Sequence, residues 1–578
     1  MNVRYYSLFL LLFVYATSSV QALTVNRLNG GASVIYIDFS IPGSVLPFEL
    51  VRSYNSITAV NEQSGWKGSF GWGWTSPFET TLITTPDQHV LLRDGSTGNT
   101  IFFKPTKEDP AVRKKFFQAA KKAYFERKKG RKVSAAELTK LQLPDQFEKG
   151  LMSDPNFRAQ VASDYGIEVS IPAGQALVSS QYGYQTIQFK NNQWIRNKAG
   201  VTQIFDGKGR LEEQRDKNGY AFYFRYSKKQ TNQVEEIHSQ DRSISLKFKW
   251  AADRVVQIVD HRGKMATYEY DSAANLTKVT DSNNQVYLYY YQEKRSPHLL
   301  TKIEYPSEAK GAALPYRELG YDKSGLVTFH RDRDGSKTSF SFGRSSTDPA
   351  DNFWTRAIIE KGSAKETEYD EFFLKKKADN SKYLYKQISK RDGVTTTTIY
   401  TSCCGKPAQV NRNGVVTTMK YYPNGLLKER VTPREEVRLE YDPRWNKVTK
   451  VVKNKFISNY KYDGGGNLVE ANNSRNDKVK LAYDRFGRIL QMVDASGRTI
   501  NFKYGANGKP SIITEKGVGT IRIDYNSDGR IVKTETVPGK RERKPSQEKS
   551  QAIVRRVMQG FQNLLNIIRP AGVNYSNG

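Results

Sequence analysis

Few side chains of this 578-residue sequence have the types and spacing that enzymatic chemistry needs. Five histidines are present, and they are dispersed without the spacing of metal ligands: His89, His238, His261, His298 and His330. No nucleophile motif with an accompanying general base can be recognised. The sequence therefore predicts a protein with no catalytic residues, no metal site and no cofactor.

Three short segments could still suggest a ligand. Asp332-Arg333-Asp334-Gly335 resembles the beginning of a calcium loop, but the later glutamate is missing, so an Asp-Gly hairpin turn is the simpler interpretation and calcium the alternative. Glycines in segment 68–73 lack the helix and lysine of a phosphate loop, and interleaved aromatic residues favour packing. Adjacent Cys403 and Cys404 could form only a strained disulfide, so we expect a buried or turn-lining thiol pair.

A repeat of about 21 residues organises the C-terminal half of the chain. Tyrosines recur there at intervals of 20 or 21 residues: Tyr400, Tyr421, Tyr441, Tyr462, Tyr483, Tyr504 and Tyr525. A glycine follows most of them four residues later: Gly425, Gly466, Gly487, Gly508 and Gly529. A second turn comes about ten residues after the first. This pattern predicts one β-hairpin per repeat, with glycine closing the turn and the tyrosine ring packing on the neighbouring hairpin. Because one hairpin is not stable alone, the hairpins must form a continuous sheet.

Two repeats carry a family resemblance. Tyr462-Asp463-Gly464-Gly465-Gly466-Asn467-Leu468 and Tyr483-Asp484-Arg485-Phe486-Gly487-Arg488-Ile489 resemble the Y-D-x-x-G-[RN]-[LI] unit of the Rhs/YD-repeat family. Ile41-Pro42-Gly43, segment 50–56 and segment 68–74 are similar to the domain that precedes the repeats in many members. The resemblance implies a mainly β protein, whose YD-repeat hairpin sheet is wound into a spiral, shell-like wall.

In this family, such shells enclose toxic C-terminal domains or form the surface of adhesion and wall-associated proteins. The R-Y-Y-D-P-x-x-G-R-F stretch that ends the shell of toxin-bearing relatives has no match here. Only about 40 residues follow the last repeat, which is below the usual size of a stable domain. We therefore expect no toxin domain on this chain.

The chain divides into five predicted segments. Residues 1–22 are typical of a secretory signal peptide, with Arg4 before an apolar core and Val20-Gln21-Ala22 at the cleavage site. An Rhs-type β domain over 23–104, a basic helical insertion over 105–165, the YD-repeat body over 166–538 and a basic linker with a helical tail over 539–578 follow. This predicts export, to the periplasm, the cell surface or the medium.

The two non-β segments show helix signals. Asp109-Pro110 and Asp154-Pro155 each resemble an N-cap followed by proline, and Ser134 with Glu137 fits a capping box. In the tail, apolar residues at intervals of four predict one amphipathic helix: Ile553, Val557, Phe561 and Leu565. Three roles stay open for it: packing on its own sheet, binding a partner, or lying on an acidic membrane surface.

The net charge completes the prediction. Ninety Lys and Arg residues against 59 Asp and Glu make +31, spread along the chain. For an exported protein this favours acidic envelope polymers or glycans over nucleic acid, with a partner protein or effector as a further partner and no transmembrane segment after signal cleavage. We expect a non-catalytic scaffold of the cell envelope or surface for adhesion, contact or assembly. The alternatives are a partial shell that encapsulates or chaperones a separately encoded effector, and an activity in the helical insertion.

Overall fold

The computed structural model describes residues 23–568, apart from 44, 61–65, 106–108, 170, 173, 180–183, 308–313, 378–381, 403 and 539–546. The predicted signal peptide and Cys403 lie outside the described residues. The protein is mainly β, as expected. Among the described helices, none is long and apolar enough to cross a membrane.

A small antiparallel sheet forms the N-terminal part. It consists of β1 (Thr24–Val25), β2 (Ala32–Ile41), β3 (Phe48–Asn55) and β6 (Trp74–Thr75), in that order. The longest pairing runs between β2 and β3, from Ser33 opposite Asn55 to Ile41 opposite Phe48. A separate two-stranded pair, β4 (Lys67–Gly68) with β5 (Gly71–Trp72), and the short helices η1 (Ser56–Ala59) and η2 (Pro77–Glu79) complete this part.

The rest of the β structure is one long sheet of 36 described strands, β7 to β42, in which each strand pairs antiparallel with the next. The strands are β7 Thr81–Thr84, β8 Val90–Asp94, β9 Asn99–Pro105, β10 Ala176–Ser179, β11 Gln185–Lys190, β12 Gln193–Lys198, β13 Val201–Phe205, β14 Leu211–Arg215, β15 Ala221–Tyr226, β16 Val234–Ser239, β17 Ser245–Ala251, β18 Arg254–Asp260, β19 Met265–Tyr270, β20 Leu276–Thr280, β21 Val286–Tyr290, β22 Lys302–Glu304, β23 Tyr316–Tyr321, β24 Val327–Arg331, β25 Lys337–Arg344, β26 Asn352–Lys361, β27 Ala364–Lys376, β28 Lys382–Arg391, β29 Val394–Tyr400, β30 Pro407–Arg412, β31 Val415–Tyr421, β32 Leu427–Thr432, β33 Glu435–Tyr441, β34 Val448–Lys453, β35 Phe456–Tyr462, β36 Leu468–Asn473, β37 Lys478–Tyr483, β38 Ile489–Asp494, β39 Thr499–Tyr504, β40 Pro510–Glu515, β41 Gly519–Tyr525 and β42 Ile531–Pro538.

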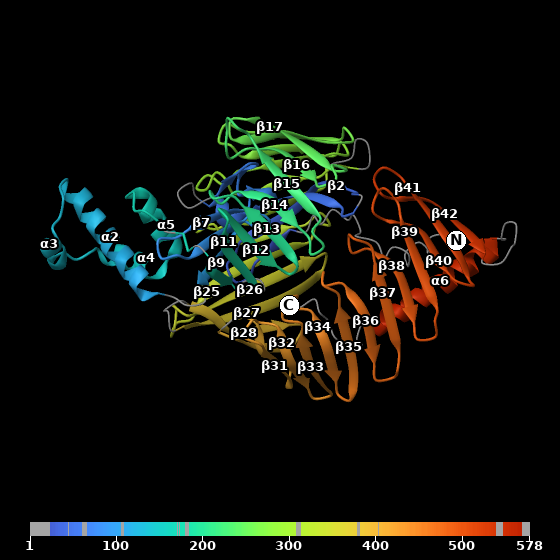
Figure 1. Cartoon of the computed structure of the whole chain (residues 1–578). Helices are drawn as coiled ribbons and strands as arrows, with labels where there is room; N and C mark the ends of the chain where they lie inside the picture. Colours follow the sequence, from blue (N-terminus) through green and yellow to red (C-terminus); the bar gives the residue numbers. More distant parts are fainter. Residues whose placement is uncertain are drawn as a thin grey trace.

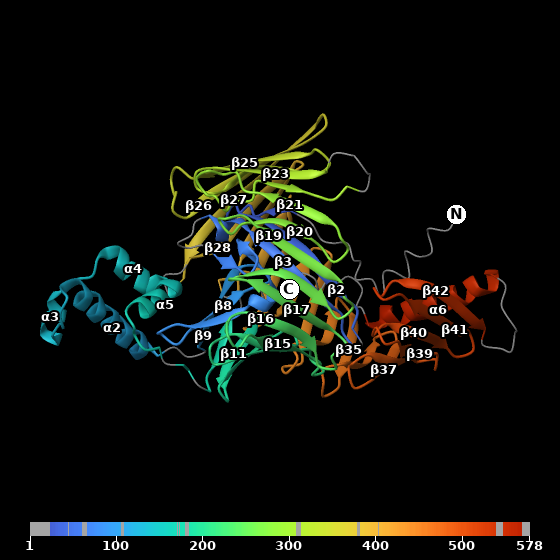
Figure 2. The ribbon, with the colours of Figure 1, turned by 90° about the horizontal axis from the view of Figure 1, so that it is seen from above.

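This sheet makes two windings. The first winding (β7–β26) curls around the N-terminal sheet, so that Figure 2 shows β2 and β3 among the green strands. Apolar residues of both join in one core cluster, in which Tyr36 and Tyr54 of the small sheet meet Tyr289 and Leu300 of the winding. The second winding (β27–β42) begins with yellow strands next to β26 in Figure 1, and its orange to red strands leave this core and extend to one side. The N-terminal sheet therefore fills the first winding.

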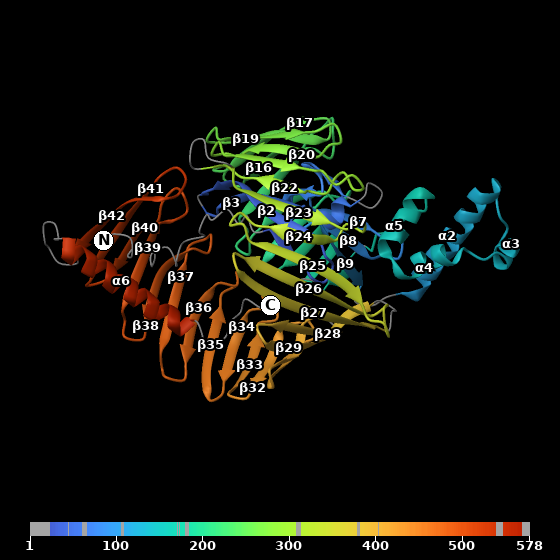
Figure 3. The ribbon, with the colours of Figure 1, turned by 180° about the vertical axis from the view of Figure 1, so that it is seen from behind.

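Five α-helices are described. Between β9 and β10, α2 (Pro110–Lys129), α3 (Ala135–Lys140), α4 (Asp145–Ser153) and α5 (Pro155–Asp164) form a helical lobe on the opposite side from the second winding (Figure 1). Asp109 and Asp154 accept backbone N–H groups at the starts of α2 and α5, which confirms both predicted N-caps. The fifth, α6 (Gln547–Ile568), packs on the second winding, as seen from behind in Figure 3.

Candidate functional site

The repeat tyrosines act through their hydroxyl groups. From Tyr421 onward each hydroxyl donates a hydrogen bond of 2.7–2.8 Å to the backbone carbonyl 14 or 15 residues earlier. The pairs are Tyr421–Pro407, Tyr441–Leu427, Tyr462–Val448, Tyr483–Leu468, Tyr504–Ile489 and Tyr525–Pro510. Tyr400 departs from this rule, since its hydroxyl donates to Oε1 of Gln387 at 2.8 Å. Each of these six bonds, which we call a tyrosine staple, ties one hairpin to the next. The spacing did not reveal this role of the hydroxyl.

The aspartate of the repeat organises the turn. One carboxylate oxygen of Asp484 accepts the backbone N–H groups of Phe486 and Arg488, and the other accepts Nε of Arg488 at 2.6 Å. Asp463 does the same with Asn467 in place of arginine. This explains why arginine or asparagine follows the turn glycine. Gly487 has φ +75°, and a Cβ there would also come within 2.2 Å of Asn218, so that only glycine fits.

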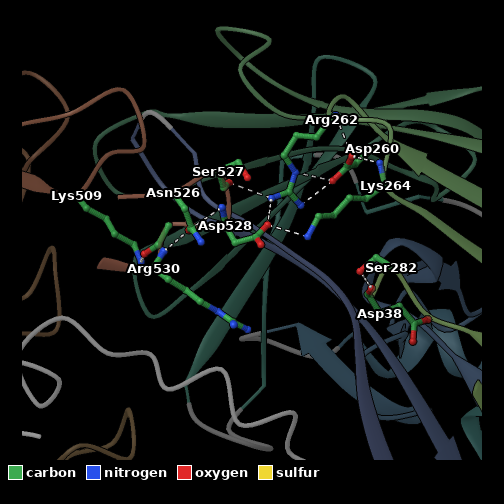
Figure 4. A network of polar contacts seen from close by, with 11 residues as sticks. Asp38, Asp260, Arg262, Lys264, Ser282, Lys509, Asn526, Ser527, Asp528 and Arg530 are labelled. Atoms are coloured by element: carbon green, nitrogen blue, oxygen red, sulfur yellow. Dashed lines mark hydrogen bonds and ion pairs between the residues drawn. The ribbon is translucent and has the colours of Figure 1, made fainter. Parts of the chain in front are cut away.

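The two windings meet at their turns, along what we call the seam. Asp528, in the turn between β41 and β42, accepts from Nη1 of Arg262 at 3.2 Å and from Nζ of Lys264 at 2.8 Å, as Figure 4 shows. These bonds lower the pKa of Asp528, with the one from Lys264 contributing most. Further along, Nζ of Lys217 donates to the carbonyl of Gly466 at 3.3 Å. Burial, together with the neighbouring Lys447, lowers the pKa of Lys217 to about 8.

A buried ion pair fastens the N-terminal sheet inside the first winding. Arg52 is 1% exposed, and its Nε donates to Asp38 at 3.0 Å. The guanidinium lies 4.4 Å from the ring centre of Trp74 and 5.5 Å from that of Tyr289, which belongs to the winding. Tyr268, also of the winding, donates to Asp38 at 2.9 Å. Charge and aromatic rings therefore hold the filling sheet in place.

The strands between the two covered regions have an uncovered face. None of the described residues in β28–β32 is buried. Cross-strand partners lie on the same face, and one such row joins Gln387, Thr398, Val410 and Thr417. The parallel row joins Ser389, Thr396, Arg412 and Val415. We call the face formed by these eight residues the open face.

The open face continues the covered face on both sides. Ser389 and Gln387 pair with Asp370 and Phe372 of β27, which are buried. Burial opposes ionisation of Asp370, but hydrogen bonds from Ser389 and from the guanidinium groups of Arg391 and Arg27 outweigh it and lower its pKa. Arg27 belongs to the N-terminal part of the chain, so the N-terminal sheet reaches the long sheet as far as Asp370 of β27.

Helix α6 covers the far part of the same sheet. Ile553 and Val557 are buried, and both belong to one apolar cluster with Ile500 and Ile521 of the sheet. Leu565 packs against this cluster while partly buried, and the side chain of Phe561 lies outside the described residues. The structure thus places the predicted amphipathic helix on its own sheet, the first of the three roles considered.

A second polar cluster joins the helical lobe to the sheet. Oδ2 of Asp87 lies 2.9 Å from Nδ1 of His89 and 3.1 Å from Nε of Arg158 of α5. Burial opposes ionisation of Asp87, but His89, Arg158 and a hydrogen bond from Thr85 outweigh it, so the pKa of Asp87 lies well below its usual range. A cavity of about 660 Å³ adjoins the cluster, lined in part by Phe116 and Met152. Because Asp87 and Arg158 are 71 positions apart, no local motif predicts their contact.

The remaining sequence motifs have structural roles. Asp334 pairs with Lys361 at 2.9 Å and accepts from the hydroxyl of Ser336 at 2.6 Å, within a hairpin turn. Phe70 and Trp74 of the glycine-rich segment are fully buried, which confirms the packing interpretation. Over the described residues, no group of three or more His, Cys, Asp or Glu side chains is placed to hold a metal ion.

Three family models match the chain. They are a domain of unknown function (DUF6531) over residues 24–103, RHS Repeat over 250–291 and Teneurin YD-shell over 411–542. No curated protein matches.

Solved structures with similarity include the crystal structure of TcdB2-TccC3 (11% identity, TM-score 0.37), that of TcdB2-TccC3-TEV (10%, 0.38) and the Tc holotoxin pore of Photorhabdus luminescens with a mutation in TccC3 (11%, 0.36). Each alignment covers 87% of this chain, but only 31%, 29% and 29% of the solved chains, respectively. The matches to RHS Repeat and Teneurin YD-shell, together with the hairpin sheet, support an Rhs/YD-repeat family protein.

Proposed function

We propose that this protein is an exported, non-catalytic scaffold of the bacterial cell envelope or surface, and that its open face binds a partner protein. The observation that carries the proposal is the lack of buried side chains in β28–β32, between two stretches of the same sheet that the chain covers itself. The open face mixes threonine with Val410, Val415 and Arg412, and such a mixture of apolar and polar area suits a protein–protein interface.

Alternation along the strands offers a matched test. Thr398 and Thr417 lie on the open face, whereas their neighbours Thr397 and Thr418 point to the opposite face. We expect the double variant Thr398→Arg/Thr417→Arg to lose a stoichiometric companion in pull-down mass spectrometry from the native bacterium. Thr397→Arg/Thr418→Arg should keep it. Equal recovery with both variants, or no companion with the wild type, would refute the proposed binding surface.

Cell location is tested separately. The signal-like residues 1–22 support export, and the net charge of +31 supports attraction to acidic envelope polymers or glycans. Fractionation and protease shaving of intact cells should find the protein outside the cytoplasm. A purely cytoplasmic pool would contradict the envelope role without touching the open face.

A second candidate is a partial shell that encapsulates or chaperones a separately encoded effector. The seam favours it, because Asp528 and Gly466 tie the second winding back to the first. An enclosed companion should resist added protease as long as the scaffold is intact. A companion bound only at the open face should be digested at the rate of the free protein.

A further inference from the structure

The excess positive charge of the helical lobe is concentrated at one place. Residues 105–165 hold 14 Lys and Arg against 8 Asp and Glu. Segment 121–132 alone holds seven Lys and Arg against one acidic residue, Glu126, so it accounts for the whole excess. This segment, the basic tip, comprises the second half of α2 and the loop before α3.

The basic tip lies far from the rest of the molecule. Figures 1, 2 and 3 all place α3, the helix directly after the tip, at the outer end of the lobe. Since α2 has 20 residues, it extends the lobe by about 30 Å. The lobe has its own apolar core around Phe116, Phe125 and Leu151. Arg158 and Arg113 attach it to the sheet through Asp87. The tip is therefore held out on a folded, anchored arm.

The side chains of the tip are available to a ligand. Six of its bases are exposed: Lys122, Arg127, Lys128, Lys129, Arg131 and Lys132. Glu137 of α3 pairs with Lys129 and Arg131, and Glu126 lies 3.9 Å from Lys122. Among the exposed large hydrophobic residues described for the lobe, only Met152 occurs, outside the tip. Attraction by this tip is thus electrostatic, without an anchor that inserts into an apolar phase.

We infer that the basic tip docks the protein on the surface of an anionic phospholipid bilayer. The six exposed bases lie between residues 122 and 132, at the end of the lobe, so several of them can come within a screening length of a flat array of phosphate groups. Stacking on the bases of a single-stranded nucleic acid would require exposed aromatic rings, and the described tip has none among its exposed residues. This surface is separate from the open face, so the inference goes beyond the proposed scaffold role and does not depend on it.

Vesicle co-sedimentation tests the inference with the full chain. The probe is phosphatidylglycerol mixed into phosphatidylcholine, compared with pure phosphatidylcholine. The variant Lys122→Gln/Lys128→Gln/Lys129→Gln/Lys132→Gln removes four charges from the tip. Its matched control removes four exposed lysines from the hairpins of the first winding: Lys208→Gln/Lys228→Gln/Lys229→Gln/Lys323→Gln. Circular dichroism serves as the control that both variants are folded.

The wild type should bind the anionic vesicles only, and raised salt should weaken the binding. One base near an anionic bilayer contributes roughly a fivefold gain in affinity, so the tip variant should lose on the order of several hundredfold. The control should lose less than about tenfold, because its lysines lie elsewhere. Equal losses in both variants would refute the assignment to the tip. Binding to a soluble polyanion without binding to anionic vesicles would refute a lipid surface.

Discussion

The two windings share their local structure but differ in what covers them. In the first winding the hydroxyl of Tyr270 donates to the carbonyl of Val255 at 2.6 Å, and in the uncovered strands of the second winding Tyr421 donates to the carbonyl of Pro407 at 2.7 Å. The first is filled by the N-terminal sheet, whereas α6 covers only the far part of the second. The stapled hairpin therefore forms with or without a covering layer. The N-terminal sheet and α6 decide which parts of the long sheet belong to a core and which remain a surface.

The largest effect should come from the filling of the first winding. Arg52→Ala would leave Asp38 charged, buried and without its main partner, so we expect a loss of about 3–5 kcal/mol in unfolding free energy. Denaturant unfolding followed by tryptophan fluorescence measures it. Arg331→Ala, which breaks the half-exposed pair with Glu318, is the control and should cost at most about 1 kcal/mol. Similar losses for both would mean that the filling sheet adds little stability.

The first winding should also respond to pH. Glu79 accepts the backbone N–H groups of Ser69 and Ser76, but burial dominates and raises its pKa from 4.5 to about 7. The folded protein keeps this proton to higher pH than the unfolded chain does. The resulting contribution to the free energy of unfolding is therefore fully present below pH 4.5 and is lost as the pH rises to 7. It amounts to about 3 kcal/mol.

Glu79→Gln should remove this decline in stability between pH 4.5 and 7. Burial also raises the pKa of Glu515, below α6 in the second winding, and Glu515→Gln is the matched comparison. The unfolding free energy of each variant, measured from pH 4 to pH 8, shows which of the two glutamates causes the decline. If the Glu79→Gln variant still loses stability over this pH range, the decline is caused by another titratable group.

In the second winding, detaching α6 should have a local effect. Val557 is 1% exposed, and an aspartate there would have to be buried unpaired or pull the helix away from the sheet. We expect Val557→Asp to lower the local stability by roughly 2 kcal/mol, the burial energy of one valine. Hydrogen exchange should then speed up in β36 and β41 but not in β15–β20. Arg556→Asp, exposed on the same helix, should leave both regions unchanged.

The smallest effect should be the same in both windings. Tyr421→Phe and Tyr270→Phe each remove one hydroxyl that donates to a backbone carbonyl, at a cost of about 1 kcal/mol. Equal changes in local hydrogen-exchange protection would support a staple that works independently of covering. A much larger change in protection at Tyr270 would show that the N-terminal sheet strengthens the hydrogen bond of this tyrosine.

Much of the wall could be predicted from the sequence, because its contacts are local. Asp484 bonds residues two and four positions ahead, and Tyr483 reaches a carbonyl 15 positions back. The packing of α6 was one of three alternatives, since an amphipathic pattern shows that a face will be covered but not by what. The open face could not be located from the repeat alone, because distant parts of the chain decide which strands are covered.

The sequence by itself determined the repeat and its turns, because both join residues within one hairpin or the next. Only the tertiary structure decided which strands are covered and where the windings meet. Arg27 and Asp370 are 343 positions apart, and Arg262 and Asp528 are 266 apart. Such pairs depend on how far each hairpin turns relative to the last. That small angle accumulates over 36 strands, and no short pattern in the sequence encodes its sum.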